Sequence, residues 1–331
     1  MKLVVQIPCF NEEQTIAQTI RDLPRTLPGF TEIEVLVIDD GSTDRTVARA
    51  KAAGADHILK LETNRGLARA FAMGLEYALT LNADVVVNTD GDNQYLGADI
   101  AVLVEPILER SADMVVGCRP IIAHPEFGLV KKLLQLLGSL TLRAISQTSV
   151  RDAASGFRAF SRESCMRLFV HSRFSYCMET LIQAGNSHLR VASINVRVNP
   201  QTRPSRLFKS VGEYIVKSGS TVLAMFILYR PGRFFGLLAG LCLAGALFLG
   251  LRFFYLVYFI AHSTEPLKAY HIPSLILLSV LALSGIGLIA LGIIAELVRA
   301  NRTVSEEMLY LQRCQMVHKE FFSKNVPAFH E

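Results

Sequence analysis

Charged residues are missing from two long stretches of this 331-residue sequence. Residues 235–251 and 272–295 contain no Asp, Glu, Lys or Arg, although 19% of the whole chain is charged and 51% is hydrophobic. The first 200 residues instead mix charged and apolar runs, as a soluble domain does. This distribution excludes a disordered, a collagenous or a purely soluble protein. At roughly 150 residues per domain, the length predicts about two units.

Several chemical signatures are also absent. The six cysteines are scattered, without a Cys-x-x-Cys pair or histidines at zinc-ligand spacing, so neither a disulfide framework nor a zinc site is indicated. The soluble region has no Gly-x-x-x-x-Gly-Lys-Ser/Thr and no Gly-x-Gly-x-x-Gly, which argues against a P-loop nucleotidase or a dinucleotide oxidoreductase. The net charge of +5 includes no long Lys/Arg block, so nucleic-acid binding is not expected. The apolar run Leu3–Ile7 is too short for a signal peptide, which predicts a cytoplasmic soluble part.

Short β-branched runs alternate with amphipathic stretches over the first 120 residues. This alternation predicts an α/β domain with a mostly parallel sheet and helices on both faces. Acidic residues follow two of the runs, at Asp39-Asp40 and at Asp90-Gly91-Asp92, and the carboxyl ends of strands are where open α/β sheets bind ligands. The expected strands are 3–7, 34–38, 57–61, 84–88 and 114–117, and the expected helices are 12–23, 43–53 and 66–81.

The uncharged stretches lie in two segments, 234–260 and 272–297, each longer than the ~20 residues that cross a ~30 Å hydrocarbon core. A buried hairpin is the alternative, but 24 successive uncharged residues would need a far larger domain to cover them. Two arginines precede the first span and two follow the second, whereas the connecting loop has one lysine and one glutamate. By the positive-inside rule both termini are then cytoplasmic. The four flanking residues are Arg230, Arg233, Arg299 and Arg302.

Two basic amphipathic segments adjoin these regions, at 127–146 and at 208–232. Each fits an ordinary helix packed on the sheet, but because a membrane segment follows directly, we expect helices in the bilayer interface. The predicted organisation is a soluble domain over 1–207, a juxtamembrane helix over 208–232, a transmembrane hairpin over 233–299 and a cytoplasmic tail over 300–331.

Asp90-Gly91-Asp92 is the most informative motif for chemistry. Two carboxylates separated by a glycine can hold a divalent cation against a diphosphate, with Gln94 as a further oxygen ligand. A lone Asp-x-Asp usually marks a solvated turn. Its place after an apolar strand, downstream of a second acidic strand end, makes the metal interpretation more specific.

The ordered series of motifs resembles the family 2 glycosyltransferases of the GT-A fold. The segments that carry the resemblance are Ile7–Glu13, Val37–Asp44, Asn64–Leu67 and Asn88–Gln94. Within that family the chain looks like the polyprenyl-phosphate hexosyltransferases, the group that contains dolichyl-phosphate mannose synthase, through Gly117–Arg119, Asp152–Arg158, Arg203 and the paired membrane segments. The resemblance covers residues 1–300 and implies a GT-A, Rossmann-like α/β fold followed by interfacial and transmembrane helices. Gly91 and Tyr95 depart from the family's usual Ala and His or Phe, and neither change removes an oxygen ligand.

The resemblance also implies roles for individual residues. Asp90, Asp92 and Arg119 would be catalytic, and Asp92 and Gln94 would hold Mg²⁺ or Mn²⁺. The acceptor phosphate would be bound by Arg119 with Lys131 or Lys132, although a structural salt bridge is the alternative for both Arg119 and Arg158. The nucleotide sugar would be bound by Pro8, Asn11, Glu12, Asp39, Asp40, Ser42, Asp90, Ser155, Gly156, Arg158 and Arg203.

The implied reaction is the inverting transfer of a hexose from a UDP- or GDP-linked donor to undecaprenyl or dolichyl phosphate at the cytoplasmic membrane, for cell-envelope glycans or protein glycosylation. A polyprenyl phosphate is already anionic near neutral pH, so the reaction needs no carboxylate base. A processive polysaccharide synthase is excluded, because those enzymes resemble one another in a Gln-x-x-Arg-Trp motif and this sequence has no Trp. Another membrane-bound family 2 enzyme with a different lipid or glycan acceptor and a non-catalytic membrane scaffold are the alternatives. Some relatives form tetramers, so a homo-oligomer is also an expectation.

Overall fold

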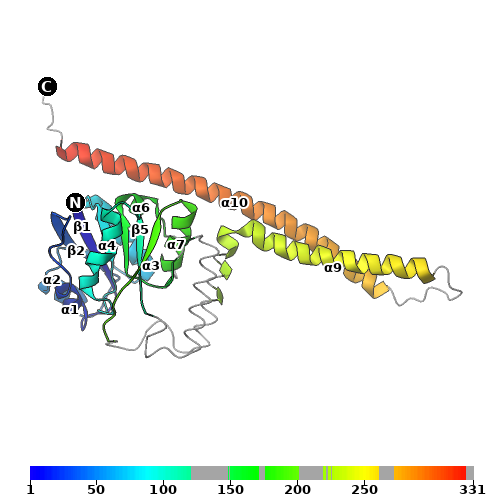
Figure 1. The fold of residues 1–331 in the computed structure, drawn as a ribbon, viewed down its shortest axis with the longest axis horizontal. Coiled ribbons are helices and arrows are strands. Elements are labelled where there is room, and N and C mark those ends of the chain that lie inside the picture. Colours follow the sequence, from blue (N-terminus) through cyan, green and yellow to red (C-terminus); the bar gives the residue numbers. More distant parts are fainter. Residues whose placement is uncertain are drawn as a thin grey trace, which may run out of the picture. The chain divides into compact units, whose positions relative to one another are not determined.

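The computed structural model describes residues 1–120, 148, 150–170, 176–200, 219–220, 223–224, 226–260 and 272–325 (Figure 1). The chain divides into two compact units. Unit 1 combines Met1–Val222 with Glu306–Glu331, and unit 2 is Leu223–Ser305. The segment 127–146, with Lys131 and Lys132, lies outside the described residues, as does Arg203.

Seven strands of the described residues form one sheet in unit 1, in the order β3-β2-β1-β4-β6-β5-β7. β6 runs antiparallel to its neighbours β4 and β5, and the other pairings are parallel. The sheet is therefore mostly parallel, as predicted. The strands are β1 (Lys2–Cys9), β2 (Glu32–Asp39), β3 (His57–Lys60), β4 (Val85–Asn88), β5 (Met114–Cys118), β6 (Arg158–Ser161) and β7 (Val191–Asn195).

Helices cover both faces of this sheet, because the central strands are apolar on both sides. Leu3, Val5 and Ile7 of β1 pack with α1, α2 and α4, whereas the other side of β1 and β2 packs against α3. Gly74 lets α3 lie close to the sheet, since a Cβ there would collide with the Gln6 Oε1 atom. The helices are α1 (Ile16–Arg21), α2 (Thr46–Ala52), α3 (Leu67–Thr80), α4 (Ile100–Leu108), α6 (Arg162–Arg167) and α7 (Tyr176–Asn186), with a 3₁₀ turn η1 (Gly97–Asp99) before α4.

The five predicted strands and three predicted helices are present, and most boundaries shift by only a few residues. α1 is the main difference, because it begins at Ile16 instead of Glu12. Residues 12–15 form a turn that contacts neighbouring loops: Thr46 accepts a hydrogen bond from the Glu12 amide, and Thr15 donates to the Gly91 carbonyl. The ends of β1, β2, β3, β4, β5 and β7, together with the start of the antiparallel β6, lie at one edge of the sheet. We call this edge the carboxyl edge.

Unit 2 contains most of the length of two helices, α9 (Pro231–Ile260) and α10 (Ile272–Asn325), that are long and apolar enough to cross a membrane. Their most apolar windows have mean hydropathies of 2.3 and 2.5. Glycines let the two helices approach closely: a Cβ on Gly285 would lie 2.7 Å from the Leu243 side chain, and one on Gly292 would lie 3.1 Å from Phe235. The two segments therefore pack as a hairpin.

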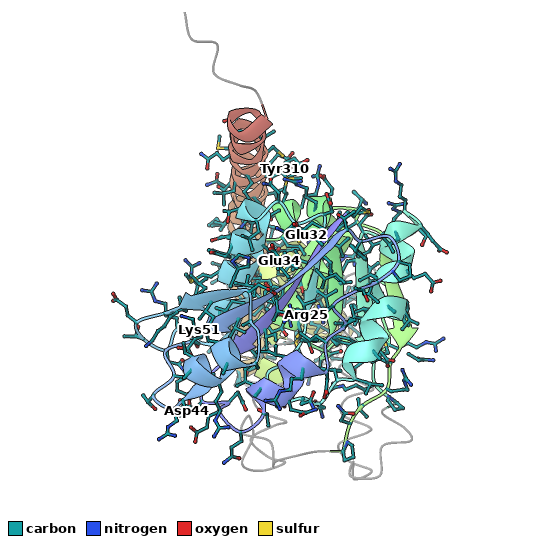
Figure 2. The ribbon with its side chains drawn as sticks, turned by 90° about the vertical axis from the view of Figure 1, so that its left-hand side faces the viewer. Arg25, Glu32, Glu34, Asp44, Lys51 and Tyr310 are labelled. Atoms are coloured by element: carbon teal, nitrogen blue, oxygen red, sulfur yellow. The ribbon has the colours of Figure 1, made fainter. Side chains whose placement is uncertain are left out.

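α10 continues past the apolar stretch, and its residues from Glu306 onward belong to unit 1. Tyr310, labelled in Figure 2, donates a hydrogen bond of 3.0 Å to the Glu163 carboxylate of α6. Arg313 donates to the carbonyls at the end of α6, including that of Leu168 at 2.9 Å, and pairs with Glu76 of α3 at 3.0 Å. The chain thus leaves the sheet domain before α9 and contacts it again through the C-terminal part of α10.

Candidate active site

The loops after β1 and β2 are fastened to each other at the carboxyl edge. The Asn11 amide donates to Ser42 Oγ at 2.8 Å, and Asn11 Oδ1 accepts from the Thr43 amide at 2.9 Å. Asp44, labelled in Figure 2, accepts hydrogen bonds from the amides of Glu13 and Thr46. Asn11 and Ser42, both predicted nucleotide-binding residues, therefore lie side by side and hold the two loops together.

The two aspartates at the end of β2 have different surroundings, although both are buried. Asp40 accepts hydrogen bonds from the amides of Arg65 and Gly66, each at 2.8 Å, so it fixes the start of α3. Asp39 accepts one long bond of 3.2 Å at Oδ1 from the Ser42 amide. Its Oδ2 atom is buried without a hydrogen-bond partner among the described residues. Because an unsatisfied buried acceptor is costly, Asp39 Oδ2 is suited to receive a donor group from a ligand.

The loop after β4 carries the Asp-Gly-Asp motif, and hydrogen bonds from residues at the start of α1 hold this loop in place. The Gly91 carbonyl accepts bonds from Thr15 Oγ1 at 2.8 Å and from Thr19 Oγ1 at 3.2 Å. A Cβ on Gly91 would lie 3.2 Å from the Cys9 Cβ atom, a tight contact that favours glycine at this position. Pro8 lies in the buried part of β1, and Glu12, almost fully buried, also accepts a hydrogen bond from Thr15. These predicted residues therefore flank the motif.

Asp90 faces the start of β6. A Cβ on Gly156 would lie 2.9 and 3.1 Å from the two carboxylate oxygens of Asp90 and 2.7 Å from the Tyr176 hydroxyl. Tyr176 stacks on Phe71 of α3, with 4.1 Å between ring centroids. Burial raises the pKa of Tyr176 well above its ordinary value, and the nearby Asp90 carboxylate also raises it. Tyr176 is therefore a neutral hydrogen-bonding hydroxyl near neutral pH.

Asp92 and Gln94 are the proposed metal ligands, and both are partly exposed. Asp92 Oδ1 accepts a hydrogen bond of 3.1 Å from the Gln94 amide, which folds the two residues into one turn. Among the described residues, no three His, Cys, Asp or Glu side chains gather closely enough to hold a metal ion by themselves. One carboxylate and one amide oxygen fit Mg²⁺ or Mn²⁺ well, because such ions often complete their coordination with water and substrate phosphates.

A buried polar network that the sequence did not reveal supports the motif from inside the sheet. Asn88 Nδ2 donates to the Gly156 carbonyl at 2.8 Å and to the Tyr176 hydroxyl at 3.1 Å. Its Oδ1 atom accepts from Gln6 Nε2 at 2.9 Å. The signal for this network was the polar Gln6 within the otherwise apolar run of β1. The network fixes the position of Gly156 relative to Asp90.

Ser155 and Arg158 are fully buried and organise the loop before β6. Ser155 Oγ lies 3.3 Å from the Tyr95 hydroxyl, and burial raises the pKa of Tyr95, so that hydroxyl is also neutral. The Arg158 guanidinium donates to the carbonyls of Ala153, Ser155 and Cys177 at 2.7–2.8 Å and to Thr180 Oγ1 at 2.8 Å. Arg158 therefore holds the backbone of the loop before β6 and of the start of α7 in place, on the predicted sugar side of the site.

Arg119 follows β5 at the same edge and forms a bidentate pair with Asp152. Its Nε and Nη2 atoms lie 2.7 and 3.2 Å from the Asp152 carboxylate oxygens. The Asp152 side chain is fully buried, and that of Arg119 is 14% exposed. Burial opposes the Arg119 charge, but the nearby carboxylates of Asp152 and Asp90 outweigh it and raise the pKa. Arg119 is thus a fixed cation in the part of the site that contains Asp90.

Every predicted site residue that the structure describes lies at the carboxyl edge or in the loops that form it. Lys131, Lys132 and Arg203 lie outside the described residues. The residues that sequence reasoning did not assign to the site are Gln6, Asn88, Asp152 as the partner of Arg119, and Tyr176.

Comparison with known proteins identifies the family. A model described as glycosyl transferase family 2 matches residues 4–169, and the chain belongs to this family. A UDP-N-acetylglucosamine–dolichyl-phosphate N-acetylglucosaminyltransferase of Methanococcus voltae is 28% identical over 68% of this chain and 92% of its own length. An undecaprenyl-phosphate mannosyltransferase of Micrococcus luteus is 29% identical over 50% of this chain and 68% of its own length.

A solved structure supports the fold. Glucosyl-3-phosphoglycerate synthase from Mycobacterium tuberculosis, crystallised with Mn²⁺, UDP and phosphoglyceric acid, matches with a TM-score of 0.52. The two proteins are 24% identical, and the match covers 68% of this chain and 77% of the synthase. The α/β domain therefore has the GT-A architecture that the motifs predicted.

Proposed function

We propose that this chain transfers a hexose from a nucleoside diphosphate sugar to a membrane polyprenyl phosphate, with inversion at the anomeric carbon. The observation that carries this proposal is the carboxyl edge itself. There the buried Asp39 Oδ2 atom, which has no partner among the described residues, the Asp92–Gln94 turn and the Arg119 cation lie at the ends of neighbouring or nearby strands. The names of the two polyprenyl-phosphate enzymes among the relatives support the same class of acceptor.

The donor half of the proposal rests on β1, β2 and β4. Asp39 Oδ2 would accept a hydrogen bond from the nucleoside, because it is a buried carboxylate oxygen at the carboxyl edge that the described residues leave without a donor. Asp92 and Gln94 would hold Mg²⁺ or Mn²⁺ against the donor diphosphate. When bound, such an ion neutralises charge that develops on the leaving diphosphate. Asp90 would contact the sugar or nucleoside, in the position that Gly156 and Tyr176 fix.

The proposed binding of the acceptor depends on positively charged side chains. A polyprenyl phosphate is an anionic nucleophile near neutral pH, so the protein must orient it and offset repulsion from the donor. Arg119, held in its charged form and oriented by Asp152, would bind this phosphate together with Lys131 or Lys132. A single displacement on an α-linked donor would give a β-linked lipid phosphate and a free nucleoside diphosphate.

The proposed location follows from the two apolar helices. We propose that α9 and α10 cross the cytoplasmic membrane and that the sheet domain and both termini are cytoplasmic, where nucleotide sugars are made. Polyprenyl phosphates are confined to the bilayer, so membrane attachment brings the enzyme to its acceptor. We also propose that the protein forms a homo-oligomer, such as a tetramer.

The test is a panel of UDP- and GDP-linked hexoses with undecaprenyl or dolichyl phosphate, with the full-length chain in detergent and nucleoside diphosphate release as the readout. Asp92→Asn should abolish turnover, and excess EDTA should do the same. Arg119→Ala should lower kcat/KM for the lipid by roughly ten- to hundredfold, the usual cost of a lost charge-assisted phosphate contact, with donor binding little changed. Asp113→Asn and Arg190→Ala are matched controls, because this pair lies at the opposite edge of the sheet.

Each part of the proposal has an outcome that contradicts it. Full activity of Asp92→Asn, or full activity in EDTA, would exclude the metal site. Weaker donor binding with an unchanged lipid KM in Arg119→Ala would exclude its acceptor role. Transfer to a glycan or another lipid, but not to a polyprenyl phosphate, would favour a different family 2 enzyme. Absence of nucleotide binding would favour a non-catalytic scaffold.

A further inference from the structure

The segment that follows β7, Val196–Asn199, runs along the carboxyl edge toward the Asp-Gly-Asp motif. The Val196 amide donates to the Cys118 carbonyl at 3.0 Å, which continues the pairing of β7 with β5. The next residue, Arg197, bonds through its amide and guanidinium to the buried Asp99 carboxylate. Val198 then forms an isolated bridge with Tyr95. Successive residues therefore fix the course of this segment.

At Asn199 the segment reaches the loop that carries the proposed metal ligands. Its amide donates to the Gln94 carbonyl at 2.8 Å, and its Nδ2 atom donates to the Asn93 carbonyl at 3.0 Å. One residue thus binds two successive carbonyls of the loop, one through the backbone and one through the side chain. The side-chain bond requires a donor, which an asparagine supplies and an aspartate of the same shape does not.

Asn93, the residue between the ligands Asp92 and Gln94, has an unusual backbone conformation. Its φ of 56° lies in the left-handed region, which non-glycine residues adopt rarely and which persists only where the surroundings enforce it. Two contacts hold it. Asn93 Nδ2 donates to Asp22 after α1 at 3.0 Å, and its carbonyl accepts from Asn199. The loop is therefore fastened from α1 on one side and from Asn199 on the other.

We infer that Asn199 is a positioning residue for the metal and diphosphate site. It fixes the peptide units that join Asp92 to Gln94, and so it sets the relative placement of the two oxygen ligands. Asn199 itself contacts neither the metal nor the sugar. The inference rests on the proposed function, because it assigns Asn199 a role at the site proposed there.

The test measures Mn²⁺ binding to the full-length chain in detergent, from the electron paramagnetic resonance signal of free Mn²⁺, in the presence of UDP and separately of GDP. Asn199→Ala should weaken nucleotide-dependent Mn²⁺ binding by about tenfold, the lower end of the range for residues that orient metal ligands. Asn199→Asp should weaken it at least as much, because a carboxylate would face the Asn93 carbonyl. Asn195→Ala is the matched control, since Asn195 is an exposed asparagine four residues earlier on β7.

Two further readouts separate positioning from a general structural role. Thermal unfolding without metal should be alike in Asn199→Ala and Asn195→Ala, and turnover of Asn199→Ala should recover at high Mn²⁺ concentration. Mn²⁺ binding like the unaltered chain in both Asn199 variants would overturn the role of Asn199 while the proposed function stood. If the unaltered chain bound no Mn²⁺ with either nucleotide, both proposals would fall.

Discussion

Gly156 is the residue whose lack of a side chain matters most to the candidate site. Its φ is not in the left-handed region, so backbone freedom is not the reason for a glycine. The reason is space, because a Cβ would lie 2.7 Å from the Tyr176 hydroxyl and 2.9 Å from Asp90 Oδ1. The Asn88 bond to the Gly156 carbonyl prevents the backbone from moving away. A methyl group here must therefore displace Asp90 or Tyr176.

We predict that Gly156→Ala lowers kcat roughly a hundredfold, because a shift of about 1 Å in a group that contacts substrate costs that much. The sheet should still form, since Gly156 lies in the loop before β6 and not within a strand. The measurement is turnover together with thermal unfolding. Gly240→Ala is the control, because a Cβ at Gly240 would meet nothing within 4 Å. Wild-type turnover in Gly156→Ala would show that the position of Asp90 is not important for the reaction.

Individual site residues were predicted by type more reliably than by role. Asp39 and Asp40 are adjacent in a motif that marks both, yet Asp40 binds the backbone just before α3, and Asp39 keeps a buried oxygen without a partner among the described residues. The difference depends on Arg65 and Gly66, which are distant in sequence. Arg158 was likewise predicted for the sugar side or a salt bridge, and its partners are mainly carbonyls. Such pairings follow from tertiary contacts that residue spacing does not contain.

At the scale of elements, the alternating pattern of the first 120 residues predicted five strands and three helices, whereas β6, β7, α4, α6 and α7 were not predicted. β6 contains Arg158 and pairs antiparallel with β4, so it departs from the pattern of parallel strands joined by helices. α10 is longer than its apolar stretch and continues to Asn325. A signal for this was present, since no Gly or Pro occurs between Gly292 and Pro327, and these residues most often end helices.

The edge strand β7 is joined to β5 by an ion pair, and this pair predicts a pH effect. Arg190 donates to Asp113 from its amide at 2.9 Å and from its guanidinium at 2.8 and 3.0 Å. Hydrogen bonds from Arg190 lower the pKa of Asp113 below its ordinary value of 3.8. Because the folded-state pKa is depressed, the stabilisation is present above the ordinary pKa and is lost as the pH falls through the folded value.

We therefore predict that Asp113→Asn lowers the Tm at neutral pH and that the difference from the unaltered chain disappears as the pH falls through the folded-state pKa of Asp113, which lies below the ordinary 3.8. The measurement is thermal unfolding in detergent over a pH series, with Asp92→Asn as the control for an aspartate outside this pair. A Tm difference that stays constant down to acidic pH would mean that the side chain acts by packing and not through its charge.

At the scale of the whole molecule, the path of the chain constrains its topology. The sheet domain precedes α9, and Tyr310 and Arg313 in α10 contact α6 of the same domain. A chain that crosses a bilayer twice between these points must begin and end on one side. Residues of unit 1 on both sides of the hairpin therefore share a compartment if α9 and α10 both span the membrane. The four arginines that flank the hairpin predict, by the positive-inside rule, that this compartment is the cytoplasm.

This topology predicts the accessibility of single cysteines in intact cells. In a background with the six native cysteines replaced, a membrane-impermeant maleimide should label Ser263→Cys, in the connection between α9 and α10, but not Ser323→Cys, near the end of α10. After the cells are lysed, Ser323→Cys should become labelled, which controls for a buried thiol. Labelling of Ser323→Cys but not of Ser263→Cys in intact cells would reverse the orientation and remove access to cytoplasmic nucleotide sugars. Labelling of both would mean that the two helices do not form a membrane hairpin with its ends in the cytoplasm.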